Sequence, residues 1–272
     1  MKYQAVLPEH NDNVSHQNPL KEFFMLMLVL ASMVLLAFWL LGFWVDMAVD
    51  FVSPDVEMGL FSEVMFLPEE ADPIRVNQQQ TLQRLLDQLQ QCVDIPHPIK
   101  LQVVVSDDVN AFAYPGGHIV VYSGLLEQVT SENGLAFVLG HELGHIKNRD
   151  HLRALGRGLV MLALSASVTG GDSDISRFLT PSVALGQAQY SQARERLADE
   201  TGLHILHCHY AHVGGATEFF EALTRRDQAY DMGVLHYFSS HPALEARIAQ
   251  LHARSAALGY GVEATKGVPD DF

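Results

Sequence analysis

Basic residues and cysteine are scarce in this sequence. Its 272 residues include 17 Lys and Arg against 32 Asp and Glu, which gives a formal net charge of −15. This balance argues against nucleic acid as a partner, because binding to phosphates requires clustered cations. Cys92 and Cys208 are the two cysteines, too few for a disulfide framework or a cysteine-based zinc finger. One disulfide between them and two unrelated buried thiols are both compatible with the sequence.

Charge is absent altogether from residues 23–45, which read FFMLMLVLASMVLLAFWLLGFWV. A helix of about 20 apolar residues is enough to cross the hydrocarbon core of a bilayer. Trp39 and Trp44 lie toward one end of the run, as is typical of a membrane interface. The run is too long for the apolar core of a cleaved signal peptide. We therefore predict a retained transmembrane helix over residues 22–45 that contacts the lipid bilayer.

Lysine and arginine are also absent from residues 46–74, whereas Lys2 and Lys21 precede the apolar run. Basic residues near a membrane helix favour the cytoplasmic side. We therefore expect a cytoplasmic tail over residues 1–21 and a large domain outside. In a bacterium this describes a single-pass protein of the inner membrane whose main domain lies in the periplasm. A second apolar run, residues 158–168, is too short to span and predicts a buried or membrane-grazing helix.

The rest of the chain reads as an acidic linker followed by one domain and a short tail. Residues 46–76 are acidic and rich in proline, which predicts a linker with short ordered pieces. The domain is expected over residues 77–258 and a loose tail over 259–272. Leucine spacing predicts a first helix over residues 77–91, with Asn77 as its N-cap. β-branched residues predict a strand over 100–108, and a Pro-Gly-Gly turn predicts a hairpin with strands 111–114 and 118–122. Helical patterns follow to about residue 255.

Two histidines four residues apart occur in the segment 137–151, FVLGHELGHIKNRDH. On a helix His141 and His145 lie on one face and can reach the same ion, and Zn²⁺ accepts imidazole nitrogen well. Glu142 is rotated away from that face, which suits a base that takes a proton from metal-bound water. Gly140 and Gly144 indicate that another element or a substrate packs closely against this helix. A short pattern of this kind also occurs in unrelated proteins, so a third ligand is required.

The third ligand is expected on a helix formed by residues 190–202, YSQARERLADETG. Glu195 and Asp199 lie four residues apart on one face of that helix. Glu195 can bind zinc, and Asp199 can then hold a ligand histidine by its second nitrogen. Spacing alone leaves Asp199 or Glu200 open as the ligand. A plain solvated face is the competing interpretation, because charged residues are dense in this segment.

Four segments taken together resemble the membrane-associated gluzincin metallopeptidases of the HtpX and CAAX prenyl protease type, and most of all the periplasmic BepA-like branch. These segments are NAFAYPGGHIVVYSGLL, HELGHIKNRD, ERLADETG and HPALEARI, in that order over residues 110–248. The resemblance implies an α+β fold, a mostly helical zincin-like (minigluzincin) domain with a small antiparallel sheet, and one Zn²⁺ per chain. It assigns the glutamate ligand to Glu195 and the second-shell aspartate to Asp199.

The same resemblance implies roles for two further places. His241, which precedes a proline, would face the oxygen that becomes negative during attack, and Arg247 would assist it. The edge strand of the hairpin would align an extended substrate through its backbone. The residues concerned are Asn110, Ala111, Phe112 and Ala113. A plain hairpin without that role is compatible with the same residues.

The resulting hypothesis is a membrane-anchored zinc endopeptidase that hydrolyses unfolded or misassembled envelope proteins in protein quality control. One alternative is a zinc-bound domain that holds client proteins like a chaperone without cleaving them. Another is an HtpX-like protease that faces the cytoplasm. A prenyl-protein protease is disfavoured, since one predicted span cannot build a membrane chamber. The hypothesis requires polypeptide substrates bound in extended form.

Several features receive no role from the sequence. His151 is interpreted as a surface residue. The histidines of residues 204–212 predict either a solvent-facing helix or, less readily, a second metal site. Residues 156–189 lie between the ligand helices and could cover the cleft as a lid. The sequence does not indicate an oligomer.

Overall fold

The computed structural model describes residues 19–61, 73–169, 191–227 and 244–268, and the chain divides into two compact units, residues 1–44 and 45–272. Helix α1, Pro19–Phe51, makes up the described part of the first unit and is 33 residues long, or roughly 50 Å at 1.5 Å per residue. Its apolar side chains are exposed along the predicted span. Among the described residues, α1 is the one helix long and apolar enough to cross a membrane.

The segment predicted to be an acidic linker begins as helix. The end of α1 belongs to the second unit, and a short helix α2, Pro54–Phe61, follows it. Glu57 of α2 is buried, with 4% of its surface exposed. We refer to residues 45–61 as the connecting segment. This part of the chain therefore packs with the domain instead of running free between two units.

The three strands form one small sheet with the order β1–β3–β2. The bounds are Lys100–Val104 for β1, Ala111–Tyr114 for β2 and His118–Tyr122 for β3. The predicted hairpin is confirmed at these residues, and β2 pairs antiparallel with β3. Gly116 and Gly117 make its turn at φ of 85° and 74°, a conformation that glycine adopts without strain.

The sheet is mixed, which corrects the expectation of a fully antiparallel one. Strand β1 pairs parallel with β3, with Lys100 opposite His118. The chain passes from β1 to the far side of the sheet before it forms the hairpin. Strand β2 is antiparallel to β1 in direction, so the next strand, β3, is parallel to β1 and lies between the two. The predicted strand also ends at Val104, four residues before the expected Asp108.

The two faces of the sheet are covered differently, following the two-residue period of strands. Odd-numbered residues such as Val103, Ile119 and Val121 join the main core with leucines of helices α3 (Pro73–Gln90) and α5 (Glu132–Lys147). Even-numbered residues such as Phe112 and Tyr114 form a smaller cluster on the opposite face. The ring of Phe61, at the end of α2, lies 6.1 Å from that of Tyr114. The connecting segment thus covers part of the second face.

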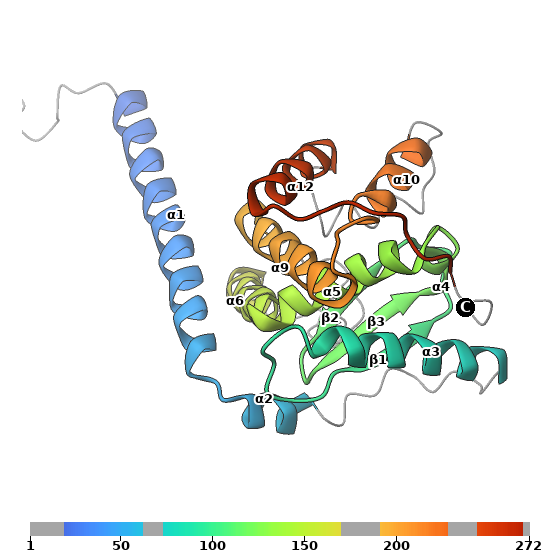
Figure 1. Ribbon diagram of the computed structural model, residues 1–272. Coiled ribbons are helices and arrows are strands. Elements are labelled where there is room, and N and C mark those ends of the chain that lie inside the picture. Colours follow the sequence, from blue (N-terminus) through green and yellow to red (C-terminus); the bar gives the residue numbers. More distant parts are fainter. Residues whose placement is uncertain (1–18, 62–72, 170–190, 228–243, 269–272) are drawn as a thin grey trace, which may run out of the picture. The chain divides into compact units, whose positions relative to one another are not determined.

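Helices α5 and α9 (Gln192–Tyr210) lie side by side in the middle of the domain (Figure 1). Helix α5 starts after Ser131, whose hydroxyl accepts a hydrogen bond from the N–H of Gly134, a typical N-cap. Helix α3 begins four residues before Asn77, so Asn77 is not its N-cap. The helices of the second unit that follow α2 within the described residues are α3 (Pro73–Gln90), α4 (Ser123–Leu126), α5 (Glu132–Lys147), α6 (Asp150–Thr169), α9 (Gln192–Tyr210), α10 (Glu218–Asp227) and α12 (Leu244–Leu258).

Two connections tie distant parts of the domain together. Cys92, just after α3, forms a disulfide with Cys208 of α9, which decides between the two readings that the sequence allowed. Residues 259–268 were expected to be loose, but backbone hydrogen bonds hold them. The N–H of Val213 donates to the carbonyl of Gly261 at 2.8 Å, and that of Glu132 donates to the carbonyl of Lys266 at 3.0 Å. The tail therefore fastens the start of α5 and the end of α9.

Candidate metal centre

Small residues allow α5 and α9 to approach each other closely. A Cβ atom added to Gly144 would lie 2.8 Å from the Cα of Ala198, and one added to Gly140 would lie 3.2 Å from the Cα of Gly202. Distances this short leave no room for a larger side chain at Gly144. The sequence-based expectation that another element packs against these glycines is confirmed. The close approach brings the polar residues of both helices within reach of one another.

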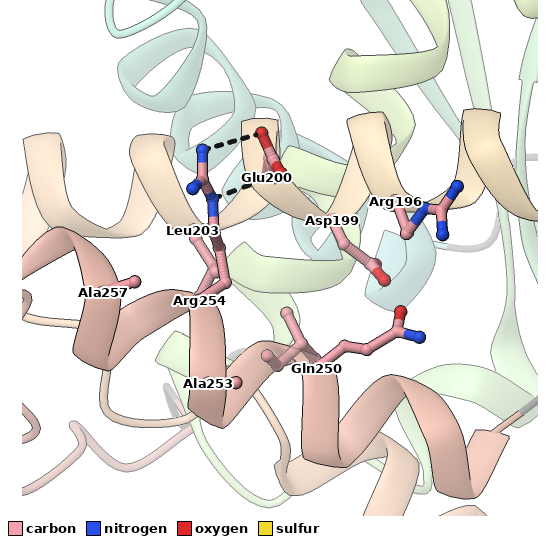
Figure 2. Close-up of a pocket in the computed structure, with 9 residues that line it drawn as sticks. Arg196, Asp199, Glu200, Leu203, Gln250, Ala253, Arg254 and Ala257 are labelled. Carbon is pink, nitrogen blue, oxygen red and sulfur yellow. Dashed lines mark hydrogen bonds and ion pairs between the residues drawn. The ribbon is translucent and has the colours of Figure 1, made fainter.

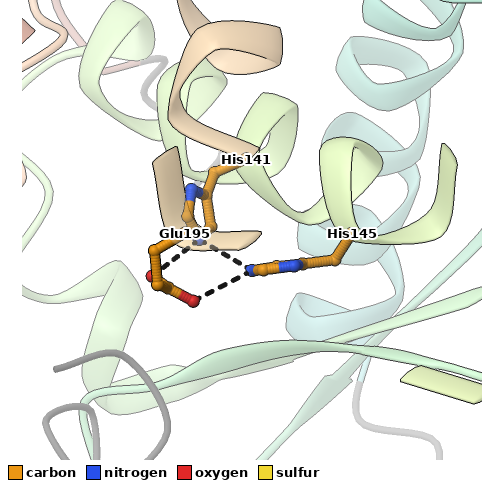
Figure 3. Close-up of side chains that lie close together, drawn as sticks. All are labelled: His141, His145 and Glu195. Carbon is orange, nitrogen blue, oxygen red and sulfur yellow. Dashed lines mark hydrogen bonds and ion pairs between the residues drawn. The ribbon is translucent and has the colours of Figure 1, made fainter. Parts of the chain in front are cut away.

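Three side chains converge between the two helices (Figure 3). His141 and His145 of α5 and Glu195 of α9 are buried, and each offers an atom within 4.8 Å of the others. The two histidine Nε2 atoms lie 3.0 Å apart. Glu195 lies 3.6 Å from Nε2 of His141 and 3.4 Å from Nε2 of His145. Ligand atoms about 2.05 Å from a tetrahedral zinc ion would lie roughly 3.3 Å apart. The residues therefore fit a zinc ion.

The other nitrogen of each histidine is held by a buried carboxylate. Nδ1 of His141 lies 2.9 Å from Oδ1 of Asp199, and Nδ1 of His145 lies 2.9 Å from Oδ2 of Asp150. Such contacts place the proton on Nδ1 and direct the lone pair of Nε2 toward a metal. Asp199 was expected in this position. Asp150 was not, although it follows His145 by five residues.

Arg247 of α12 neutralises the carboxylates that surround the histidines. Its Nε donates to Oδ2 of Asp199 at 3.0 Å, and its Nη1 lies 2.8 Å from Oε2 of Glu195. The guanidinium also lies over the ring of Phe220, 4.5 Å from the centroid. With 3% of its surface exposed, Arg247 is buried behind the ligand atoms. His241, its expected partner in catalysis, lies outside the described residues.

Burial and neighbouring charge set the protonation of this cluster. Burial and the charge of Arg247 lower the pKa of His141, which leaves this ring neutral as a metal ligand must be. Burial also opposes charge on His145, but the hydrogen bonds that its ring donates to the carboxylates of Asp150 and Glu195 outweigh this effect and raise its pKa. Burial raises the pKa of Asp199, but the charge of Arg247 outweighs this effect and lowers it overall. The cluster therefore attracts a positive charge, which a metal ion would supply.

Glu142 contacts the edge strand of the sheet. Its Oε2 accepts a hydrogen bond of 2.9 Å from the backbone N–H of Ala113. The backbone N–H of Tyr122 donates to the carbonyl of Asn110. The backbone groups of Asn110, Phe112 and Tyr114 therefore face β3 and bond to it. Because direction alternates along an antiparallel strand, Ala111 and Ala113 point their backbone groups to the outer edge. The side-chain oxygen of Asn110 is buried and makes no hydrogen bond within the described part of the chain.

His151 is buried, which corrects its interpretation as a surface residue. Only 1% of its surface is exposed, and its Nε2 lies 2.8 Å from Oε1 of Glu57. Glu57 also accepts hydrogen bonds from Arg149 and from the backbone N–H of Gly116. Local sequence patterns could not predict this contact, because 94 residues separate Glu57 from His151.

The histidines of residues 204–212 have other partners. The ring of His207 stacks on that of Tyr260 at 4.0 Å, and Nδ1 of His212 accepts the N–H of Gly214 at 3.0 Å. In the ranges that the structure describes, the group with metal-binding geometry is the one at His141, His145 and Glu195. Most of the segment expected to form a lid, residues 170–189, lies outside the described residues.

A groove of about 320 Å³ runs between α9 and α12 (Figure 2). Arg254 spans its rim through two contacts of 3.2 Å with Glu200. Asp199 contributes to the wall, but none of the three candidate ligands does. The groove is therefore distinct from the metal centre and meets it only through Asp199.

Two histidines from one helix, a glutamate from a second and a carboxylate beside the first ligand define the site of a metallopeptidase. Residues 76–255 match Peptidase family M48, and the chain belongs to this family. The resemblance seen in the sequence motifs is thereby confirmed, as are the mostly helical fold and the small sheet.

Three metalloproteases are each similar to this chain over about 60% of its length. The chain is 32% identical over 169 residues to metalloprotease LoiP and 30% identical over 165 residues to metalloprotease YcaL, both of Escherichia coli (strain K12). These alignments cover 60% and 59% of this chain, and 65% and 63% of the relatives. The beta-barrel assembly-enhancing protease of the same organism is 28% identical over 172 residues, which is 58% of this chain and 34% of that protein. The chain thus matches less than two thirds of each relative's length.

Proposed function

We propose that this protein is a membrane-anchored zinc endopeptidase. The observation that carries the proposal is the convergence of His141, His145 and Glu195 beside a glutamate that is bonded to a strand edge. The distances between the ligand atoms suit tetrahedral zinc, and both histidines are oriented by carboxylates. Zn²⁺ bound there would lower the pKa of a water molecule and polarise the scissile carbonyl.

Glu142 is the general base of the proposed reaction. Its carboxylate takes the proton of the attacking water and passes it to the leaving amine. The hydrogen bond from the N–H of Ala113 fixes the position of Oε2. The same hydrogen bond sets the distance between the base and the strand along which the substrate would lie. Proton transfer therefore occurs at the place where the substrate backbone is held.

The outer edge of β2 is the proposed binding site for the substrate. Ala111 offers its N–H and carbonyl there, and Ala113 offers its carbonyl, so an extended peptide would add as a further strand. Asn110 would hold a substrate backbone group with its side-chain amide, which supplies a partner for its buried oxygen. Backbone recognition of this kind tolerates varied side chains, as a protease for unfolded proteins requires.

Arg247 is proposed as a positioning residue. Its guanidinium is engaged with Asp199 and Glu195, so it acts by holding the ligand shell. Stabilisation of the oxyanion is assigned to His241, on the strength of the family resemblance.

The proposed location is the periplasmic face of a bacterial inner membrane, with quality control of envelope proteins as the task. The disulfide between Cys92 and Cys208 supports an oxidising compartment. The name of the beta-barrel assembly-enhancing protease supports a role in the envelope. A reporter that fluoresces only in the cytoplasm, fused after residue 75, tests the orientation. Fluorescence of that fusion would contradict the proposal.

The activity itself is tested with the purified full-length protein in detergent. We expect about one zinc per chain, cleavage of unfolded casein, loss of cleavage with a chelator and recovery when zinc is added. Protein that holds zinc and leaves casein intact would contradict the peptidase and favour a chaperone-like role.

A further inference from the structure

A continuous line of contacts joins the connecting segment to a candidate zinc ligand. Asp46 lies in the last turns of α1 and accepts a hydrogen bond of 3.3 Å from Nη2 of Arg194. Nη1 of the same arginine bonds to Oδ1 of Asp150. Oδ2 of Asp150 in turn lies 2.9 Å from Nδ1 of His145. Four side chains from α1, α9, α6 and α5 therefore form one series.

Asp150 depends on Arg194 for a charge partner. Its side chain is 0% exposed, and its two oxygens divide between Arg194 and His145. A buried carboxylate that loses its cation is poorly tolerated and turns toward another donor or toward water. Such a turn would release Nδ1 of His145. The orientation of this ligand therefore rests on the position of Arg194.

Asp46 holds Arg194 in place from the other side. The Arg194 side chain is 22% exposed, so its position is not fixed by packing alone. Arg194 also directly precedes Glu195 in the sequence, so a displaced side chain would disturb two ligands. Asp46 receives a second cation, Arg157, at 2.6 Å. Arg157 and Arg194 thus bond to the same oxygen of Asp46, Oδ2.

The connecting segment reaches the substrate side of the site as well. Oε1 of Glu57 accepts the N–H of Gly116, in the turn between β2 and β3, at 3.2 Å. Arg149 lies in the turn between α5 and α6, with a left-handed backbone at φ 57°, and bonds to Glu57 and to the carbonyl of Val49. The segment thus contacts both the hairpin and the end of the helix that carries the histidines.

We infer that the connecting segment is a positioning element of the metal centre, with Asp46 and Arg194 orienting His145 through Asp150. The inference rests on the proposed zinc site and adds that the chain next to the membrane helix completes that site. Outer partners of a ligand histidine contribute about 10-fold to 100-fold to metal affinity. Changes in this segment should therefore alter zinc binding without touching a ligand.

The test measures the zinc dissociation constant of the full-length protein by competition with a chelator. Arg194→Gln should weaken zinc binding by about 10-fold to 100-fold, and Asp46→Asn by a smaller factor of about 3 to 10. The double variant should bind zinc no more weakly than Arg194→Gln, because Asp46 acts through Arg194. The visible absorption spectrum of the cobalt-substituted protein should shift in both single variants, since it reports the geometry of the ligands.

Two matched variants separate this role from general stability. Arg157→Gln removes the second cation that bonds to Asp46. Asp50→Asn changes another carboxylate of α1, one that pairs with Arg153 of α6. Both should keep the parental zinc affinity within about twofold, because neither residue bonds to Arg194 or Asp150 and the bond between Asp46 and Arg194 remains. Equal zinc affinities for Asp46→Asn and Asp50→Asn would overturn the inference. So would a lowered melting temperature with an unchanged dissociation constant.

The measurement is independent of proteolysis. Asp46 is 27% exposed at its side chain, so Asp46→Asn provides an answer even where Arg194→Gln does not fold. If the parent binds zinc but leaves casein intact, the proposed peptidase fails while the zinc affinities still decide the role of the connecting segment.

Discussion

The backbone N–H of Ala113 donates a hydrogen bond of 2.9 Å to Oε2 of Glu142. This contact joins the outer edge of β2 to the residue that follows the first candidate ligand. Glu142 is 1% exposed, so its carboxylate is held by a backbone group in a site from which water is largely excluded. A carboxylate in such surroundings is suited to proton transfer in the reaction, whereas a purely structural metal site has no need of one.

Replacement of Glu142 by glutamine tests this assignment. Glutamine can accept the N–H of Ala113 but cannot take a proton from water. We expect Glu142→Gln to retain zinc and the fold while its cleavage rate falls by about 10²-fold to 10⁴-fold. Zinc content, circular dichroism and casein cleavage should be measured on the same sample. Glu127→Gln removes an exposed carboxylate and should cleave like the parent. Parental cleavage by Glu142→Gln would refute the mechanism.

Arg247 should be essential for stability because two buried carboxylates share it. In Arg247→Met, Asp199 and Glu195 would face each other without a cation. We expect a loss of about 3–5 kcal/mol in the free energy of unfolding, measured by chemical denaturation. Zinc affinity should fall as well, because both carboxylates belong to the ligand shell.

Arg254→Met is the matched control for this substitution. Arg254 lies on the same helix and also contacts a carboxylate of α9, but its side chain is 46% exposed. A pair as exposed as this contributes about 0–1 kcal/mol. Similar losses for both variants would show that Arg247 does not hold the buried carboxylates together.

The close approach of α5 and α9 predicts that Gly144→Ala destabilises the domain. Helix propensity alone favours alanine over glycine by about 1 kcal/mol. The new Cβ would lie 2.8 Å from the Cα of Ala198, however, and overpacking of this kind costs about 1–3 kcal/mol. The steric term should outweigh propensity, so the melting temperature should fall.

Gly59→Ala provides the opposite case in α2. A Cβ at Gly59 would meet no atom within 4 Å, so only the propensity term remains. The melting temperature should stay level or rise. If Gly144→Ala were as stable as the parent, the two helices would have to lie farther apart than they do here.

The ligands could be predicted from sequence because they follow from local spacing on two helices. Residues four apart share a helix face, which placed His141 with His145 and Glu195 with Asp199. Spacing could not choose among Glu195, Asp199 and Glu200, since the choice depends on how α9 is rotated against α5. The family resemblance supplied the assignment of Glu195, and the structure brings that residue to the histidines.

Contacts between distant segments could not be predicted in this way. Glu57 meets His151 across 94 residues, and Asp46 meets Arg194 across 148. In the sequence the acidic residues 46–72 indicated the orientation of the membrane helix, and an acidic segment next to a membrane is usually solvated. The structure shows that three of them form ion pairs with arginines. Asp46 and Asp50 pair with arginines of α6 and α9, and Glu57 pairs with Arg149 in the turn between α5 and α6.

The buried carboxylate of Glu57 predicts a dependence of stability on pH. Burial alone would raise the pKa of Glu57, but the hydrogen bond and charge of His151, together with Arg149, outweigh it and lower the pKa from 4.5 to about 2. A carboxyl group whose pKa is lower in the folded state stabilises the fold above its unfolded pKa. That stabilisation is lost as the pH falls from about 4.5 to about 2. A shift of this size corresponds to roughly 3 kcal/mol at neutral pH.

The difference between the parent and Glu57→Gln isolates this contribution from that of other carboxylates. At pH 7 the variant should be less stable by roughly 3 kcal/mol, because His151 and Arg149 lose their anion. As the pH is lowered from 5 to 3, the parent should lose stability faster than the variant, and the gap should narrow. Thermal unfolding followed by circular dichroism across this range measures both curves. A gap that stays constant with pH would mean that Glu57 is not a charged partner of His151 and Arg149 in the folded protein.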